Sequence, residues 1–409
     1  MAVTIWWKQP RPPAGLKLPG KQVLGWNCRA FWTQGGAINN LAKLVKANLS
    51  GPVPKILAPG AGHGHNSLLK NMAPPLKILA IQFRYFGDTV LVVPALRAIR
   101  EHYPDCALHL LVPEEVAPLL RHLPWLTHLW LMPRKRGHAR ISQSWPVIRA
   151  LRAERFDRSV EFSGGDRGAI LSWLCGARER LGPFYPGGFL GRRFCYTQRV
   201  TPAPLNRHET LRALHILSAW GIDSPRSLEM EIHTDPALDA AARKILPERK
   251  IICHLASSQP KKEWPLTHWM ALHRLAAAAG LKLIFATGTG AREESLLNDF
   301  KRLAPDAPVL QPIPDLALYL AVLKRAEVFV SGDTGPLHFA AGVGVPTLAL
   351  FGATSPVLWA PIGGHHRLLT GSPCSCSGKV GVCQSANHCL AAISPEQVLA
   401  GLQNILTRV

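Results

Sequence analysis

The chain has 409 residues, 47% of them hydrophobic, and a formal net charge of +21. This length allows two domains with full cores. No apolar run of about 18 residues occurs and the first residues lack a signal-peptide core, which argues against a membrane-spanning or secreted protein. The nine cysteines are mostly scattered, which favours a reducing cytoplasm. This positive charge favours an anionic partner, such as nucleic acid, acidic lipid or phosphorylated glycan.

The first 75 residues differ from the rest of the chain. Residues 1–71 hold nine Lys or Arg and no Asp or Glu, with several Trp and Pro and no clear periodicity. We expect residues 1–75 to be a poorly ordered basic extension, or an upstream read-through before a start at Met72. An arm that binds an anionic surface is the alternative.

Residues 76–245 alternate between apolar strands and amphipathic helices. Such alternation predicts a doubly wound parallel sheet. The stretch 182–208 reads as loop. The expected strands are 78–81, 108–112, 129–132 and 158–162, and the expected helices are 89–102, 113–122, 145–156, 169–176 and 209–221.

The pattern restarts in residues 246–409. Two α/β units joined by a connector predict a ligand site at the carboxyl ends of their strands. The expected strands are 251–255, 282–286, 328–330 and 347–351, and the expected helices are 266–279, 291–303, 316–325 and 337–343.

A glycine turn precedes the predicted helix 337–343. Residues 331–335 read Ser-Gly-Asp-Thr-Gly, and Pro336 stands where the first helical turn begins. Backbone N–H groups and the helix dipole at such a terminus favour an anion such as a diphosphate. An ordinary tight turn between a strand and a helix explains the pattern equally well.

The tail of the chain is rich in cysteine. Its spacing lacks a pair of C-x-x-C knuckles, so structural thiols are the expectation and a zinc or cluster site is the alternative. The candidate ligands are Cys374, Cys376, Cys383 and Cys389, with His388 among them.

Four pieces of sequence together resemble the heptosyltransferases of lipopolysaccharide core assembly, glycosyltransferase family 9. They are 86–88 (Phe-Gly-Asp) with 94–97 (Pro-Ala-Leu-Arg), 262–265 (Lys-Glu-Trp-Pro), 288–294, and 333–338 (Asp-Thr-Gly-Pro-Leu-His) with 350–352 (Leu-Phe-Gly). The resemblance runs from Leu76 to the C-terminus. The stretch 165–171, the Gly-Ala-Arg at 176–178 and the cysteine-rich tail before 393–396 are similar to the subgroup called heptosyltransferase III.

The resemblance implies a GT-B fold of two Rossmann-like domains. It implies inverting, metal-independent transfer from ADP-heptose to an inner-core glycolipid, with no cofactor. The N-terminal domain would handle the acceptor and the C-terminal domain the nucleotide. A cytoplasmic enzyme on the inner face of the inner membrane, with no nucleic-acid partner, is the expectation.

The resemblance also assigns two reactive residues. Asp88 matches the family's proposed general base, although an Asp at a helix start can serve only as an N-cap. Lys262 matches a lysine that contacts the donor phosphates, although the adjacent Lys261 could take the role.

Further residues would bind the donor. Asp333, Thr334 and Gly335 match the phosphate-binding turn, and Pro336 is assigned to the same donor site. The Thr334 hydroxyl and the N–H groups from Gly335 onward would donate to phosphate, while Asp333 would contact sugar hydroxyls or hold the turn. His338 is a phosphate donor or a buried, satisfied histidine. Gly288 and Glu293 match the ribose-binding turn; the register with Glu294 is open, and a Glu at a helix start also favours the dipole.

Acceptor binding is assigned to arginines of the N-terminal domain. Arg84 follows the first strand. Arg149 and Arg152, with Arg155, recur at spacings of three on one predicted helix, where a phosphate-bearing glycolipid would suit them. A solvated helix face is the alternative.

Three other functions compete with this interpretation. The first is another sugar-nucleotide enzyme on the same fold, with a different donor or as an epimerase. The second is a nucleic-acid-binding protein, which the charge suggests but no motif supports. The third is a degenerate homologue with a structural role only.

Overall fold

The computed structural model describes residues 75–133, 141–185, 187–189, 191–374 and 388–407. The predicted extension, apart from Pro75, lies outside the described residues. The described residues belong to a single compact unit.

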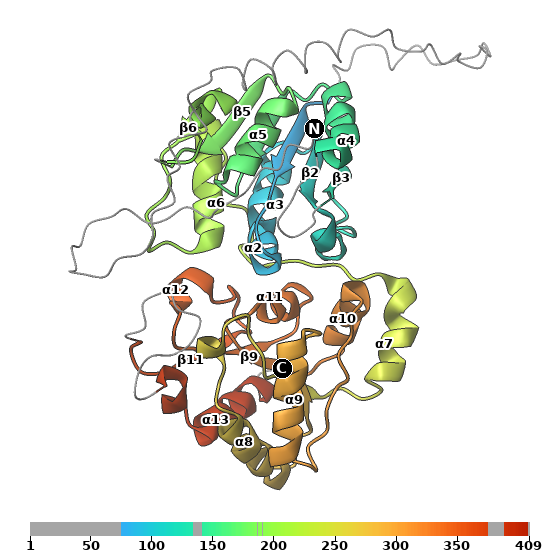
Figure 1. Cartoon of the computed structure of the whole chain (residues 1–409), viewed down its shortest axis with the longest axis vertical. Coiled ribbons are helices and arrows are strands. Elements are labelled where there is room, and N and C mark those ends of the chain that lie inside the picture. The colour runs from blue at the N-terminus through green and yellow to red at the C-terminus, as the bar shows by residue number, and fades with distance from the viewer. Residues whose placement is uncertain (1–74, 134–140, 186, 190, 375–387, 408–409) are drawn as a thin grey trace, which may run out of the picture. The chain divides into compact units, whose positions relative to one another are not determined.

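The first sheet is built from six parallel strands in the order β3-β2-β1-β4-β5-β6 (Figure 1). Their order is that of a doubly wound nucleotide-binding sheet, with a switch point between β1 and β4. The strands are β1 (Lys77–Ile81), β2 (Ala107–Pro113), β3 (His128–Met132), β4 (Arg158–Glu161), β5 (Glu179–Pro183) and β6 (Gln198–Val200).

Helices cover both faces of this sheet because its central strands are apolar on both sides. Ile78 and Ala80 of β1 belong to the core cluster that includes α3 (Val93–His102) and α6 (Glu209–Leu217). Leu79 and Ile81 pack on the opposite face with α4 (Ile141–Ala153) and α5 (Asp166–Leu174). The short helix α2 (Phe86–Leu91) precedes α3.

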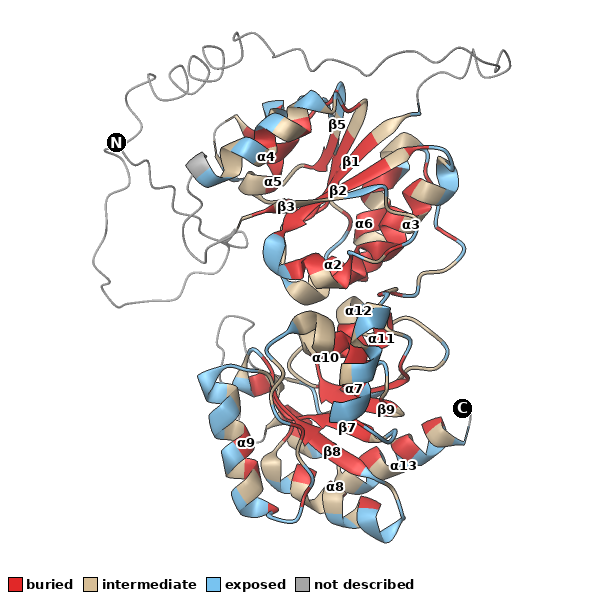
Figure 2. Cartoon of the chain, turned by 90° about the vertical axis from the view of Figure 1, so that its right-hand side faces the viewer, coloured by how far each residue is buried: buried red, intermediate tan, exposed pale blue. Residues whose placement is uncertain are grey.

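The second sheet has five parallel strands in the order β11-β10-β9-β7-β8, with a switch point between β7 and β9. They are β7 (Ile251–His254), β8 (Leu283–Ala286), β9 (Val328–Gly332), β10 (Thr347–Phe351) and β11 (Arg367–Thr370). Figure 2 shows central strands such as β1, β2, β7 and β9 in the buried class, whereas the edge strands β3, β6 and β11 are partly exposed.

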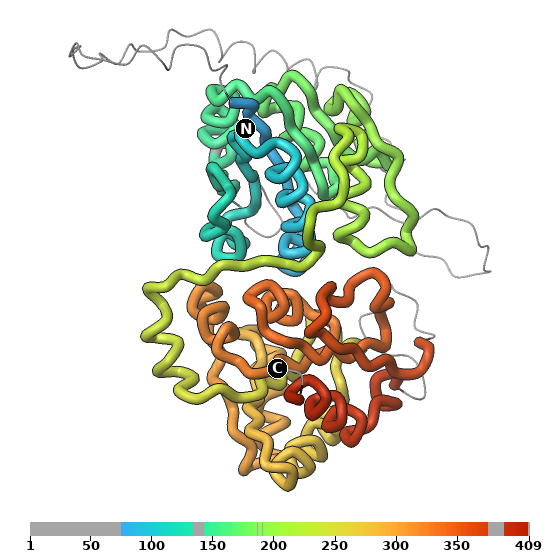
Figure 3. The backbone as a smooth tube through the Cα atoms, turned by 180° about the vertical axis from the view of Figure 1, so that it is seen from behind, coloured from blue at the N-terminus to red at the C-terminus, as the bar shows by residue number. Residues whose placement is uncertain are grey.

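The helices of the second half again lie on two faces. One face carries α10 (Leu316–Leu323) and α11 (Gly335–Gly342), and the other carries α8 (Leu266–Ala278), α9 (Ala291–Leu303) and α13 (Pro395–Leu406). The chain reaches this half from α6 through residues 221–235, which form no regular element, and then α7 (Asp239–Ile245), as Figure 3 traces. The predicted division near residue 245 stays a prediction.

Several predicted elements were wrong in detail. The helix expected at 89–102 is two helices, α2 and α3, and the helix expected at 113–122 is a short 3-10 turn, η1 (Glu114–Leu119). The stretch expected to be loop, 182–208, contains part of β5 and all of β6. Among the described residues, every helix is too short or too polar to cross a bilayer.

Candidate active site

The loops that carry the predicted site residues follow the strands at the two switch points. Arg84 and Asp88 come after β1, and Ser163 comes after β4. In the second sheet, Ser257 follows β7 and Asp333 follows β9. In doubly wound folds ligands bind at this place, where loops from neighbouring strands diverge to opposite faces.

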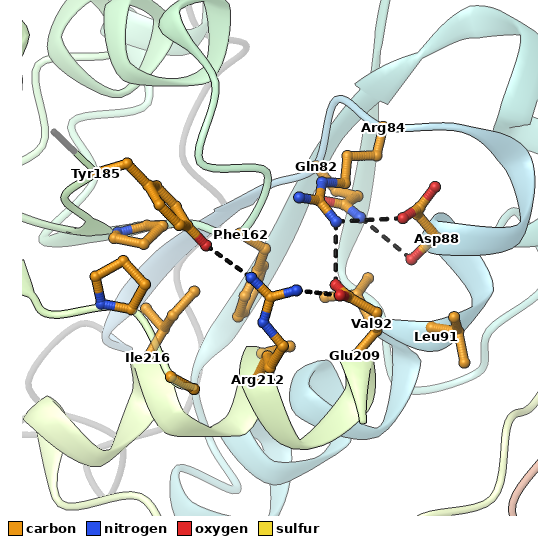
Figure 4. A pocket seen from close by; sticks show the side chains of 14 residues that line it. Gln82, Arg84, Asp88, Leu91, Val92, Phe162, Tyr185, Glu209, Arg212 and Ile216 are labelled. Atoms are coloured by element: carbon orange, nitrogen blue, oxygen red, sulfur yellow. Dashed lines mark hydrogen bonds and ion pairs between the residues drawn. The ribbon is translucent and has the colours of Figure 1, made fainter. Parts of the chain in front are cut away.

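Asp88 lies in the first turn of α2, where Tyr85 occupies the N-cap position. The N-cap position itself belongs to Tyr85, but the Asp88 carboxylate accepts a hydrogen bond from the Tyr85 backbone N–H, so the predicted alternative of a helix-terminus role stays open beside that of a base. The Asp88 side chain is 14% exposed, and its Oδ1 accepts a hydrogen bond of 3.3 Å from Arg84 Nη1. The same nitrogen donates to Glu209 Oε2 at 3.0 Å, so one guanidinium joins two carboxylates (Figure 4).

Glu209 continues this chain of charges along α6. Its other oxygen pairs with Arg212, whose Nη2 donates to the Tyr185 hydroxyl at 3.1 Å (Figure 4). These side chains line a cavity of about 30 Å³. Such a volume holds one or two water molecules, so a sugar would reach Asp88 only at the mouth of the cavity.

The surroundings of Asp88 suit a base. Burial raises the pKa of the carboxyl above its ordinary value, the Arg84 charge opposes this, and the nearby Glu209 charge adds to it. A carboxylate with a raised pKa takes up a proton more readily than an ordinary aspartate, which is the property that general-base catalysis requires.

On the C-terminal side, Lys262 ends the 3-10 turn η5 (Pro260–Lys262). Its Nζ lies 2.7 Å from Asp333 Oδ2, with side chains 19% and 8% exposed. A Cβ at Gly332 would lie 2.3 Å from the backbone oxygen of Lys262, so only glycine allows this approach of the two loops. Lys261 is buried. Asp333 thus holds Lys262 at the turn.

Thr334 is the N-cap of α11, and Gly335 and Pro336 open the helix. Among the described residues Thr334 makes no side-chain capping hydrogen bond. His338 is buried within the next turn, and burial lowers its pKa to about 4, so the imidazole is neutral near pH 7. Within the described part of the chain its Nδ1 has no hydrogen-bond partner. A neutral imidazole can donate an N–H but adds no positive charge.

Glu293 folds back over the glycine turn that precedes α9. Its Oε2 accepts from the Gly290 N–H at 3.0 Å, and a Cβ at Gly288 would lie 2.4 Å from the same oxygen. Glu294 is exposed. The carboxylate nearest the turn is therefore that of Glu293, and its predicted contact with a ribose stays a prediction.

The Asp88 loop lies against the start of α11. A Cβ at Gly87 would lie 2.9 Å from His338 Cδ2 and 3.7 Å from the Gly335 Cα. Phe86 and Phe339 meet edge to face, with ring centroids 6.4 Å apart. The carboxylate predicted as the base and the helix terminus predicted to bind the diphosphate are thus on neighbouring segments.

Arg152, at the C-terminal end of α4, lies away from Asp88. The helix α4 ends near the start of β4, and Asp157 accepts a hydrogen bond from the backbone N–H of Lys77, the first residue of β1. Arg152 Nη1 donates to the Leu174 carbonyl at 3.2 Å, at the C-terminus of α5. This end of the helix is therefore at the amino edge of the sheet, whereas Asp88 follows the carboxyl edge. Arg152 is therefore engaged with the C-terminus of a helix, and Arg149 is exposed. Acceptor binding by these two arginines stays a prediction.

The cysteine-rich tail is described only in part. Cys376 and Cys383 lie outside the described residues, while Cys374 is half-buried and Cys389 is buried. Across the described ranges, no three His, Cys, Asp or Glu side chains are grouped so that they could hold a metal ion. A metal at these cysteines stays a hypothesis.

Two carboxylates near the site were missed from the sequence. Glu209 was read only as a helix start. Glu161, at the end of β4, is fully buried and accepts from the Ser163 N–H at 2.7 Å and the Tyr196 hydroxyl at 2.9 Å. An acidic residue in the apolar run Val160-Glu161-Phe162 was the available signal, since a buried carboxylate needs such partners.

Solved structures share this architecture. A glycosyltransferase of family 9 from Veillonella parvula aligns with a TM-score of 0.73 at 21% identity, over 83% of this chain and 99% of that one. The ADP-heptose LPS heptosyltransferase II of Escherichia coli aligns with a TM-score of 0.64 at 20% identity, over 81% and 99%. The protein therefore has the GT-B fold, in which two α/β domains each contribute a parallel sheet.

The family follows from the sequence match. The model of glycosyltransferase family 9 (heptosyltransferase) matches residues 144–388, more than half of the chain, and the chain belongs to this family. It is a glycosyltransferase. Lipopolysaccharide heptosyltransferase 3 of Escherichia coli is 24% identical over 294 residues, which are 68% of this chain and 84% of that protein.

Proposed function

We propose that the enzyme transfers heptose from ADP-heptose to the inner core of lipopolysaccharide, with inversion and without a metal. The proposal is supported by the family match and by relatives whose names state lipopolysaccharide heptosyltransferase and ADP-heptose. The single observation that carries the mechanism is the approach of the Asp88 loop to the start of α11. An inverting displacement needs a base and a leaving-group site close together.

In the proposed reaction, the Asp88 carboxylate accepts the proton of an acceptor hydroxyl as its oxygen attacks the anomeric carbon of the donor. The bond from that carbon to the diphosphate oxygen breaks, and ADP leaves with the electron pair. Lys262 and the N-terminus of α11 stabilise the charge that develops on the diphosphate. Asp333 holds Lys262 ready before the donor arrives.

The acceptor is assigned to the N-terminal domain. Arg84 is paired with two carboxylates, so we assign it to Asp88 rather than to the glycolipid. We further propose a cytoplasmic enzyme that works on the inner face of the inner membrane, where a net charge of +21 favours anionic lipid.

The test is turnover with purified components. The full-length protein, ADP-heptose and a heptose-deficient lipopolysaccharide should release ADP and give a glycolipid heavier by one heptose. Release of nucleotide only with a UDP-sugar, or conversion of the donor without any acceptor, would contradict the proposal and favour the other sugar-nucleotide functions.

Lys262→Gln is the matched variant for this assay. The loss of one preorganised cation beside a leaving group costs on the order of 10²–10³ in kcat. Lys282→Gln is its control, because Lys282 forms an exposed ion pair with Glu248 away from both switch points. Equal turnover by the two variants would remove Lys262 from the mechanism.

A further inference from the structure

We propose that Glu209 is a positioning residue, which holds Arg84 against Asp88 and so fixes both the direction of that carboxylate and the charge that faces it. The proposal rests on the proposed function, in which Asp88 is the base.

The guanidinium of Arg84 is fixed at three points. Its Nε donates to the Ser163 carbonyl at 3.2 Å, and its Nη1 is shared between Asp88 Oδ1 at 3.3 Å and Glu209 Oε2 at 3.0 Å. Glu209 makes the shorter of the two shared contacts. Without it, Nη1 would be left to Asp88 alone, and the carboxylate would be drawn toward the arginine.

The position of Glu209 is itself fixed by the start of α6. The Thr210 hydroxyl donates to the Leu91 carbonyl of α2 at 3.0 Å, and the Thr210 N–H donates to Nδ1 of the N-cap residue His208 at 3.2 Å. Arg212 holds the second oxygen of Glu209. The carboxylate therefore cannot follow Arg84 if that side chain moves, which is what a positioning role requires.

Asp88 and Glu209 are balanced by two guanidiniums, so that the cluster is close to neutral. The other titratable groups that face it are the hydroxyl of Tyr185 and the buried carboxyl of Glu161. Charged groups on the other elements packed against α2 and α6 are exposed or paired elsewhere. On α3, Arg97 pairs with Glu231 and Arg100 donates to the Trp125 carbonyl. Burial lowers the pKa of both His208 and His338, and the acids of η1, Glu114 and Glu115, are exposed. The charge felt by Asp88 is therefore set mainly by Arg84 and Glu209.

The charges of Arg84 and Glu209 shift the pKa of Asp88 in opposite directions, so two variants can tell their effects apart. Burial raises the pKa of Asp88; Arg84 lowers it and Glu209 raises it. Glu209→Gln removes the negative neighbour and leaves Arg84 to Asp88, so the acidic limb of the kcat/KM profile should move to lower pH. Arg84→Gln removes the positive neighbour, so the same limb should move to higher pH.

The kinetic test uses the full-length protein with ADP-heptose and lipopolysaccharide acceptor. Glu209→Gln should lower kcat about tenfold on the plateau, because Asp88 becomes a weaker base, with donor KM changed less than about twofold. Glu179→Gln is the control, since Glu179 pairs with Arg158 at the far edge of the sheet and should leave the limb in place. A Glu209→Gln limb that stays in place, whether or not kcat falls, would overturn the proposal.

A second readout needs no turnover, so it distinguishes failure of this proposal from failure of the proposed function. The melting temperatures of three proteins, the wild type, Glu209→Gln and Arg84→Gln, are measured from pH 4 to 8. Each is compared with the same protein carrying the additional change Asp88→Asn, so that the difference reports the contribution of Asp88. A carboxyl with a raised folded pKa contributes stability at low pH that is lost as the pH rises through that value. This loss should be smaller with Glu209→Gln and larger with Arg84→Gln. Identical pH dependence in all three proteins would show that Glu209 only anchors a helix.

Discussion

The ion pair between Lys262 and Asp333 makes a measurable prediction about stability. Asp333 is the more buried partner, with a side chain 8% exposed against 19% for Lys262. Lys262→Met leaves a nearly buried carboxylate without its counter-charge, which should cost about 2–3 kcal/mol, between the values for exposed and buried pairs. In a domain of this size each kcal/mol shifts the melting temperature by about 2–4 °C, so we expect a fall of about 5–10 °C.

The double variant decides whether the pair is the cause. Lys262→Met with Asp333→Asn should melt higher than Lys262→Met alone, because the uncompensated charge is gone. Asp333→Asn alone should cost less than Lys262→Met, since the ammonium can reach water. Thermal unfolding followed by scanning calorimetry measures all four proteins. A double variant that melts no higher than Lys262→Met would refute the reasoning.

Three further predictions concern single side chains. Gly332→Ala should lower the melting temperature, since its Cβ would meet the Lys262 backbone oxygen at 2.3 Å and overpacking costs about 1–3 kcal/mol. As the pH falls from 6.5 toward 4, the melting temperature of the wild type should fall relative to that of His338→Gln, because burial lowers the folded pKa of His338 to about 4 and the unfolded chain binds the proton first. Parallel curves of melting temperature against pH would contradict the burial of His338 as a neutral ring. Arg152→Gln should keep full turnover while melting slightly lower, because Arg152 contacts the Leu174 carbonyl; a rise in acceptor KM would support the predicted acceptor role instead.

Elements with strong local signals could be predicted from the sequence. The helix at Ala291–Leu303 was predicted with its observed bounds, because a glycine turn precedes it and Glu293 stands at the capping position. The central strands were found because they are buried on both faces and therefore read as apolar runs.

Elements with weak local signals were missed. The edge strand β6 has three residues, two of them exposed, so it carries no apolar pattern. The break between α2 and α3 had a signal that the prediction did not use: Pro94 stood inside the expected helix, and proline is tolerated in the first turn but not in the interior.

The site residues also divide into those that stand in short sequence motifs and those brought together only by the fold. Asp88, Lys262 and Asp333 stand in short motifs that a single sequence can display. The partner of Arg84 on α6 is 125 residues away, and no local pattern reports that Glu209 meets it. The arginines on α4 could be placed on one helix from their spacing, but a helical spacing does not show which edge of the sheet the end of that helix reaches.

The most direct test of the central claim separates binding from chemistry at Asp88. Asp88→Asn should bind ADP with unchanged affinity by calorimetry, since the groups proposed to hold the donor, Lys262 and the start of α11, are left intact. Its kcat for heptose transfer should fall by about 10²–10⁴, the contribution expected of a general base. Turnover within about threefold of the wild type would contradict the claim that this carboxylate accepts the proton of the acceptor hydroxyl.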